Sequence, residues 1–113
     1  MLALTTIKWD ESEIIVAASK SNDDSWTTKI PWVDIEKIVV YKRDVFAYDL
    51  ICLFVDFKGN EIELNEEMDG WDSLLETLPL KLPGALVRED WWEKVAFPPF
   101  ATNPTLIFIL QCK

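Results

Sequence analysis

The residues of this chain that could do chemistry are almost all carboxylates, because it contains 20 aspartates and glutamates and no histidine. The absence of histidine removes Ser–His and Cys–His nucleophile pairs and imidazole metal ligands. Two carboxylates can still serve a glycosidase. The nearest candidates are Asp44 with Asp49 and Glu66 with Glu67. The adjacent Glu66 and Glu67 would face opposite ways on a strand, and no substrate cleft is evident in so short a chain. We therefore expect no enzyme.

Metal and cofactor sites are not indicated by the sequence. In the segment from Asp56 to Asn60, glycine falls at the fourth place instead of the sixth and lysine takes a ligand position, so the spacing of an EF-hand calcium loop fails. Cys52 and Cys112 cannot supply the four ligands of a structural zinc site. We expect a buried thiol and a terminal thiol rather than a disulfide between them, with no metal and no cofactor.

Composition limits the class of protein. A chain of 113 residues is the size of one domain, residues 1–113, and its formal charge of −9 would repel nucleic acid and anionic membranes but attract a basic partner. The longest apolar run, Leu50 to Val55, is far shorter than the roughly 20 residues of a membrane-spanning helix. Residues 1–10 lack the features of a signal peptide. We expect a cytoplasmic protein without a membrane partner.

Acidic residues cluster between Gly59 and Leu80, where the chain has no lysine or arginine. The seven carboxylates of this stretch are Glu61, Glu63, Glu66, Glu67, Asp69, Asp72 and Glu76. The last three are spaced i, i+3 and i+7, which places them on one face of a predicted helix. Two interpretations stay open: a solvated face that provides solubility, and a docking surface for a basic protein.

A pair of tryptophans, Trp91 and Trp92, follows in a second predicted helix. Adjacent residues cannot share one helical direction, so at least one indole is expected to be partly exposed. Partly exposed tryptophan is common at interface hot spots, but packing at the open end of a sheet would explain the pair equally well.

The elements that would position these residues are mainly strands. A central strand is predicted at 49–57 because apolar residues occupy both of its faces, and a three-residue connection containing Gly59 leads into a strand at 61–64. Further strands are predicted at 2–9, 13–19, 26–30 and 38–41, with one helical turn at 31–35.

Helical spacing begins after the central hairpin. An apolar stripe predicts a helix that starts at an Asp69 N-cap and ends at Leu78, before Pro79. A shorter helix is predicted from Asp90 to the prolines at 98–99, and a last strand at 106–110 is expected to pair inside the sheet. The order predicts an α+β fold: a mainly antiparallel, curved sheet of about six or seven strands, shaped as a PH-like half-barrel, with one main helix and one short C-terminal helix.

The segment from Pro31 to Leu110 resembles a family of small, largely uncharacterised bacterial proteins. The resemblance rests on the sequences YKRD at 41–44, DLICL at 49–53, EEMDGW at 66–71 and WEKVAFPPF at 92–100, and it implies no established activity. In size, acidity and lack of catalytic groups the chain is also similar to immunity proteins of bacterial contact-dependent or polymorphic toxin systems. This second likeness is one of type and implies no residue roles.

Two functional hypotheses follow. The first is an immunity protein, monomeric or weakly dimeric when free, that neutralises a basic nuclease-type toxin by covering its active site with the seven carboxylates, with Trp91 or Trp92 as an apolar contact. The second is a PH-like module that binds a peptide or small ligand between the sheet and the second helix, near Lys42, Arg43 and Asp44.

Overall fold

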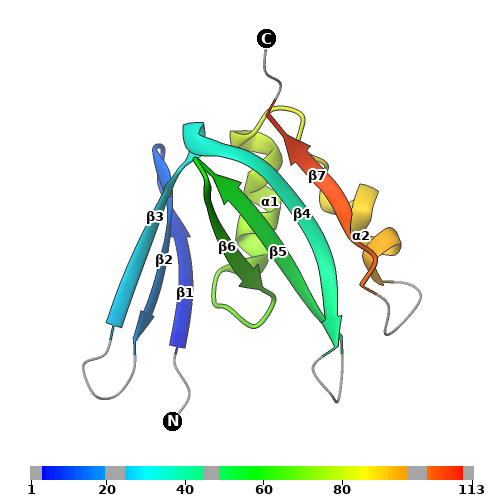
Figure 1. Ribbon diagram of the computed structural model, residues 1–113, viewed down its shortest axis with the longest axis horizontal. Helices are drawn as coiled ribbons and strands as arrows, with labels where there is room; N and C mark the ends of the chain where they lie inside the picture. Colours follow the sequence, from blue (N-terminus) through cyan, green and yellow to red (C-terminus); the bar gives the residue numbers. More distant parts are fainter. Residues whose placement is uncertain (1–3, 20–24, 45–48, 97–101, 111–113) are drawn as a thin grey trace.

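The computed structural model describes residues 4–19, 25–44, 49–96 and 102–110. In this part of the chain it is an α+β protein with two antiparallel sheets and two α-helices (Figure 1). The first sheet has the order β1-β2-β3 and the second has the order β6-β5-β4-β7. The strands of the first sheet are β1 (Leu4–Trp9), β2 (Glu13–Ser19) and β3 (Ser25–Pro31). Those of the second are β4 (Ile35–Asp44), β5 (Asp49–Phe57), β6 (Asn60–Asn65) and β7 (Thr105–Ile109).

The strand count matches the prediction, but the strands divide into two sheets instead of one. The 3-10 turn η1 (Trp32–Asp34) separates β3 from β4, at the helical turn expected from the sequence. Pro31 precedes it with φ −60° and no main-chain N–H to donate. The Trp32 indole N–H donates to the Asp10 carbonyl oxygen at 2.9 Å. This contact holds the turn against the β1–β2 connection, so the chain changes sheet there.

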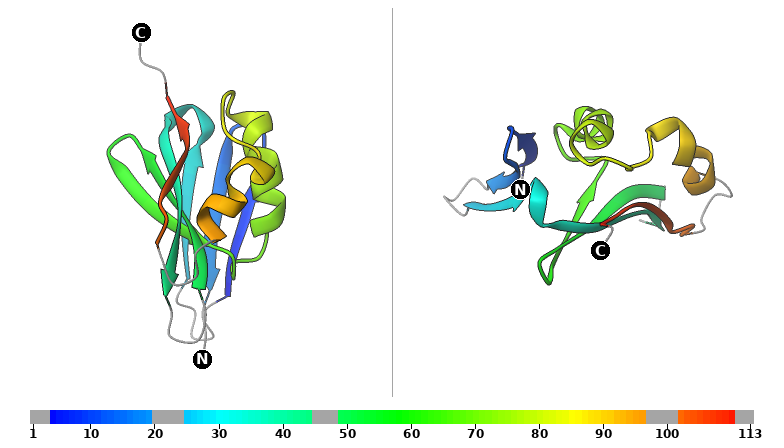
Figure 2. Two further views of the ribbon diagram at one scale, coloured as in Figure 1. Left: turned by 90° about the vertical axis from the view of Figure 1, so that its right-hand side faces the viewer. Right: turned by 90° about the horizontal axis from the view of Figure 1, so that it is seen from above.

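Both sheets and both helices share one hydrophobic core. Ile14 and Val16 of the first sheet, Leu53 and Val55 of the second and Leu74 of α1 belong to the same buried cluster. The helices α1 (Trp71–Lys81) and α2 (Arg88–Ala96) lie on one side of the sheets (Figure 2). The tip of the β5–β6 hairpin lies on the other side in both views of that figure.

The central hairpin has a tighter turn than predicted. Phe57 pairs with Asn60, so the connection consists of two residues, Lys58 and Gly59. Both have positive φ, 47° and 78°, which is the backbone conformation of a two-residue turn that matches the twist of the strands. The prediction of a three-residue connection was therefore wrong. β5 is central, between β4 and β6, as its apolar pattern indicated.

The start of α1 also differs from the prediction. Gly70, at φ 95°, occupies the N-cap position, and no side chain caps the helix. Asp69 instead makes main-chain hydrogen bonds to β1: the Ile7 N–H donates to its carbonyl at 2.7 Å, and its N–H donates to the Thr5 carbonyl at 3.0 Å. A Cβ atom at position 70 would collide with the Ile7 carbonyl oxygen, so this contact between β1 and the helix start requires glycine.

The predicted end of α1 at Leu78 was wrong, because the helix continues to Lys81 with Pro79 inside it. The Leu82 N–H donates to the Leu78 carbonyl at 2.8 Å, and the side chains of Leu78 and Leu82 are both buried. Burial of these two leucines holds the last turn although Pro79 lacks an N–H to donate. The second helix begins at Arg88, two residues before the predicted start; its predicted end at the prolines 98–99 lies outside the described residues.

The last strand was predicted to pair inside the sheet, and this was wrong. Among the described strands β7 pairs only with β4, so it forms an edge of the second sheet. Both of its faces are apolar, but they are not equally buried: the adjacent Ile107 and Phe108 are buried beside a register shift in the β4–β7 pairing, while Leu106 and Ile109 are about half exposed. An apolar alternation on both faces therefore does not by itself indicate a central strand.

Candidate functional site

The described residues form an open groove between α1 and α2. Two adjoining hollows, of about 440 and 190 Å³, share Arg88 and Glu89 as lining residues. We call this surface the α1–α2 groove; it is lined by Leu75, Glu76, Pro79, Val87, Arg88, Glu89, Trp92 and Glu93. The helices bring it together because their apolar stripes pack on the same side of the sheets (Figure 2), which leaves their polar faces to line the surface between them.

The groove is acidic around an aromatic side chain. Glu76, Glu89 and Glu93 are exposed, and the indole of Trp92 is 37% exposed. Val87 adds an exposed apolar side chain beside them. Glu89 and Glu93 line the same hollow as the Trp92 indole, and both a ring face and carboxylates attract positive charge.

The single basic residue of the groove shows this preference. The Arg88 guanidinium lies 5.4 Å from the centroid of the Trp92 ring and forms an ion pair with Asp72 of α1 at 3.0 Å. A guanidinium therefore contacts both the aromatic ring and a carboxylate of the neighbouring helix. The Trp92 ring and the Asp72 carboxylate therefore already contact a cation that belongs to this chain.

The predicted site residues do not form a single surface. Glu76 of α1 and Trp92 of α2 line the groove, and Asp72 of α1 lies at its margin. Trp91 is 1% exposed and belongs to the core, so it is not part of the groove. The expectation that at least one of the two indoles is partly exposed is confirmed by Trp92.

The five other carboxylates of the acidic stretch lie elsewhere. Glu61 follows the turn of the β5–β6 hairpin, whose tip lies away from the helices (Figure 2). Glu66 accepts a hydrogen bond from the Ile51 N–H at 3.0 Å. Glu67 and Asp69 are exposed in the segment between β6 and α1. These residues are close in the sequence, but they do not lie on one surface of the protein.

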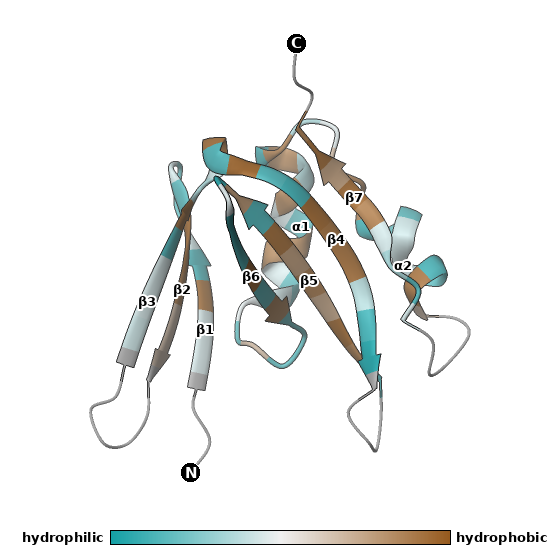
Figure 3. Cartoon of the chain, in the orientation of Figure 1, coloured by the Kyte–Doolittle hydropathy of each residue, from teal (hydrophilic) through white to brown (hydrophobic). Residues whose placement is uncertain are grey.

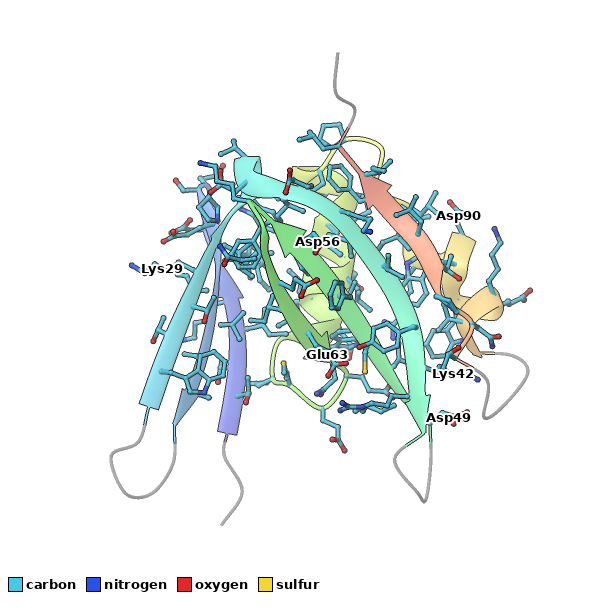
Figure 4. All side chains as sticks on the ribbon, in the orientation of Figure 1. Lys29, Lys42, Asp49, Asp56, Glu63 and Asp90 are labelled. Atoms are coloured by element: carbon cyan, nitrogen blue, oxygen red, sulfur yellow. The ribbon has the colours of Figure 1, made fainter. Side chains whose placement is uncertain are left out.

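Glu63 belongs to a polar cluster on the face of the second sheet away from the helices; Figure 4 labels it on β6. It forms an ion pair with Arg43 at 3.2 Å and accepts a hydrogen bond from the Tyr41 hydroxyl. Burial and the Glu63 carboxylate raise the pKa of Tyr41 above its ordinary value. Burial, followed by the charge of Glu63, raises the pKa of the neighbouring Cys52 thiol to about 11. The cluster is therefore uncharged at Tyr41 and Cys52 near neutral pH.

The space between α2 and the sheet is filled by side chains. Trp91 and Val95 are fully buried there, and Lys42 of β4 reaches the end of the helix. The Lys42 ammonium donates to the Ala96 carbonyl at 2.8 Å and forms an ion pair with Asp49 at 3.2 Å; Figure 4 shows both charged residues at the same end of β4 and β5. Lys42 and Asp49 therefore have a structural role: they join the ends of β4, β5 and α2.

Sequence reasoning missed Arg88, Glu89 and Glu93 as parts of the groove. The available pattern was their spacing around Trp92, because Arg88 to Trp92 and Glu89 to Glu93 are both i, i+4 pairs on one helix face. The proximity of Arg88 and Glu89 to Glu76 depends on how the two helices lie relative to one another, which no local spacing reveals.

Comparisons of this chain with protein-family models, with curated proteins and with solved structures found no match. Within the described residues, no group of three or more histidine, cysteine, aspartate or glutamate side chains is arranged to hold a metal ion. None of the described helices has the length and apolar character to cross a membrane. What the fold and site define is thus an α+β protein with an acidic, tryptophan-containing groove between its helices.

Proposed function

We propose that this chain is a non-catalytic protein-binding protein that docks its α1–α2 groove on a basic partner. The observation that supports this most directly is the position of Arg88 over the Trp92 ring and against Asp72. The groove and its margin contain four carboxylates, Asp72, Glu76, Glu89 and Glu93, against this one guanidinium. Complementary charge would accelerate association, and the exposed indole would supply buried apolar area.

The partner that we propose is a basic nuclease-type bacterial toxin domain, with this chain as its cytoplasmic immunity protein. The support is the acidity of the whole chain, −9, together with its similarity in type to such proteins. A surface of carboxylates would occupy a nuclease active site in place of phosphates. No nucleic acid or membrane contact forms part of this proposal.

The test is inhibition of a basic nuclease domain encoded by a reading frame next to that of this chain. We expect one equivalent of the protein to abolish nuclease activity. Glu89→Lys with Glu93→Lys should slow association at low salt by about ten-fold or more, because like charges replace complementary ones. The matched control, Glu61→Lys with Glu67→Lys, has the same net charge as this variant, but its substitutions lie outside the groove. It should associate nearly as fast as the unaltered protein.

Two outcomes would contradict the proposal. Equal slowing by both double variants would show that total charge, rather than the groove, controls association. A Trp92→Ala variant that inhibits as tightly as the unaltered protein would exclude the indole as a contact.

The alternative, a PH-like module with a ligand between the sheet and α2, has less support. Trp91 and Val95 occupy that space, and the Lys42 ammonium is held by Asp49 and Ala96. The PH-like half-barrel itself stays a prediction: the seven antiparallel strands of the described residues favour it, whereas the division into two sheets and the position of β7 after α2 disfavour it.

A further inference from the structure

Arg88 lies where the two hollows of the α1–α2 groove adjoin, between helices along which hydrophilic and hydrophobic residues alternate (Figure 3). Its Nη1 donates to the Asp72 Oδ1 at 3.0 Å, and the guanidinium lies 5.4 Å from the centroid of the Trp92 ring. The groove therefore contains a site for one guanidinium, formed by a carboxylate of α1 and an indole of α2. This chain fills the site with its own arginine.

Helix stability does not explain the position of this arginine. Arg88 is the first residue of α2, where the helix dipole favours negative charge and disfavours a cation. The two residues that follow it, Glu89 and Asp90, have the acidic side chains that are typical of a first turn. The contacts with Asp72 and Trp92 are therefore the ones that locate the Arg88 guanidinium.

The contacts of Arg88 are weak enough to exchange. The Asp72 side chain is 76% exposed and that of Arg88 is 35% exposed, so water screens the ion pair and the pair adds little stability. The Trp92 indole is partly exposed as well, and a contact between a cation and a ring is also weak at such a site. Exposed side chains change rotamer rapidly. The guanidinium can therefore leave the site without a movement of either helix.

The chemistry of the site favours arginine over lysine as an incoming group. A guanidinium is planar, so its face can lie on an indole while N–H groups in its plane donate to a carboxylate. An ammonium is a compact, strongly hydrated charge without such a plane. Three further carboxylates, those of Glu76, Glu89 and Glu93, line the hollows around Arg88. They attract other basic side chains of the same incoming segment.

We propose that Trp92 and Asp72 form an exchangeable guanidinium site, in which an arginine of a basic partner replaces Arg88. This inference rests on the proposed function and deepens it, because it names the group of the partner that enters the groove. Replacement of one guanidinium by another adds no net contact, so Arg88 acts as an internal competitor that lowers the apparent affinity. A partner that also engages Glu89 or Glu93 gains enough to displace it, which restricts the groove to segments with several basic residues.

The probe is a synthetic tetra-arginine peptide, titrated into the full protein while the indole N–H signals are followed by NMR. Arg88→Gln empties the site, so this variant should bind the peptide about five-fold more tightly than the unaltered protein does. The matched control is Lys94→Gln, because Lys94 is an exposed lysine of the same helix that does not line the groove. It makes the same change in net charge and should strengthen binding by less than about two-fold at physiological salt.

Further variants locate the gain in affinity. Arg88→Lys keeps the net charge and should still bind the peptide about two-fold more tightly than the unaltered protein, because an ammonium competes less well for this site. Addition of Asp72→Asn or of Trp92→Leu to Arg88→Gln should each remove most of the gain, since each deletes one half of the site. A tetra-lysine peptide should gain less from Arg88→Gln than the tetra-arginine peptide does.

Three outcomes would overturn the inference. Equal gains for Arg88→Gln and Lys94→Gln would show that net charge alone controls binding. An unchanged or lower affinity of Arg88→Gln, including no detectable binding, would show that Arg88 does not compete for the site. A gain that persists without Asp72 or Trp92 would place the peptide elsewhere. The titration contains no nuclease, so its failure with nuclease inhibition intact would leave the proposed function standing, and the reverse result would refute the toxin as partner while the site remained.

Discussion

The two faces of α2 differ in how deeply their side chains are buried. Its inner face places Trp91, at 1% exposure, and Val95 in the core, and its C-terminal carbonyl at Ala96 accepts a hydrogen bond from Lys42. Its outer face places Trp92, at 37% exposure, under the Arg88 guanidinium. We therefore expect the two adjacent indoles to contribute unequally to the free energy of unfolding. The same holds for the buried ion pair Lys42–Asp49 and the exposed ion pair Arg88–Asp72, because the effect of breaking an ion pair depends on its burial.

Substitution of the two tryptophans should give the largest difference in stability between the two faces. Trp91→Ala should lower the free energy of unfolding by about 3–5 kcal/mol, because it removes a buried indole and leaves a cavity. Trp92→Ala should lower it by less, about 1–2 kcal/mol, since 37% of that residue is exposed and its removal leaves no enclosed cavity. Urea unfolding followed by circular dichroism measures both. Similar losses for the two variants would contradict the distinction between the faces.

The buried ion pair should give the next largest effect. Lys42→Met should lower the free energy of unfolding by about 3 kcal/mol, because it leaves Asp49 without this cation and Ala96 without this donor. Lys42→Met with Asp49→Leu should recover much of this loss, since a buried ion pair can often be replaced by apolar groups. A double variant no more stable than Lys42→Met would show that the Asp49 charge is not the cause.

Alkaline pH should produce a further difference between buried and exposed groups. The pKa of Cys52 is raised from 9.0 to about 11 by burial, and that of Tyr41 is also raised. The folded state then holds protons that the unfolded state releases, so stability is complete below pH 9 and declines as the pH rises through 11. Unfolding free energies measured from pH 8 to 11 test this, and Cys52→Ala should flatten the slope between pH 9 and 11.

The exposed ion pair should have the smallest effect. Asp72→Asn should lower the free energy of unfolding by less than about 1 kcal/mol, because the Asp72 side chain is 76% exposed and water screens its pairing with Arg88. The small loss should vanish at high salt. A loss of 2 kcal/mol or more in urea unfolding would mean that this pair supports the packing of α1 against α2.

Much of the fold could be predicted from local patterns. Alternation identified the strands of the first sheet, because side chains on a strand alternate between two faces, and apolar residues on both faces identified the central position of β5. The spacing of Trp71, Leu74, Leu75 and Leu78 identified the apolar stripe of α1, and all four side chains are buried. What failed were the ends of elements, where Gly70 meets β1 and where burial of Leu82 outweighs the effect of Pro79.

The groove was predicted only in part, because it too depends on contacts between separate elements. Asp72, Glu76 and Trp92 were identified by type and spacing, whereas Arg88, Glu89 and Glu93 joined them through the packing of one helix beside another. Glu61 and Glu63 were grouped with the helix acids by position in the chain, but the hairpin directs them to other parts of the surface.

The amino-acid sequence alone determined the lack of histidine chemistry, the acidity, the strand-rich α+β class and the divergence of two neighbouring indoles. These properties depend on composition and on the short periods of helix and strand, which act within a few residues. The tertiary structure decided which carboxylates gather, which indole is buried and which strand forms an apolar edge. Those outcomes depend on contacts between residues distant in the chain, because one shared core has to bury the apolar faces of all the elements together.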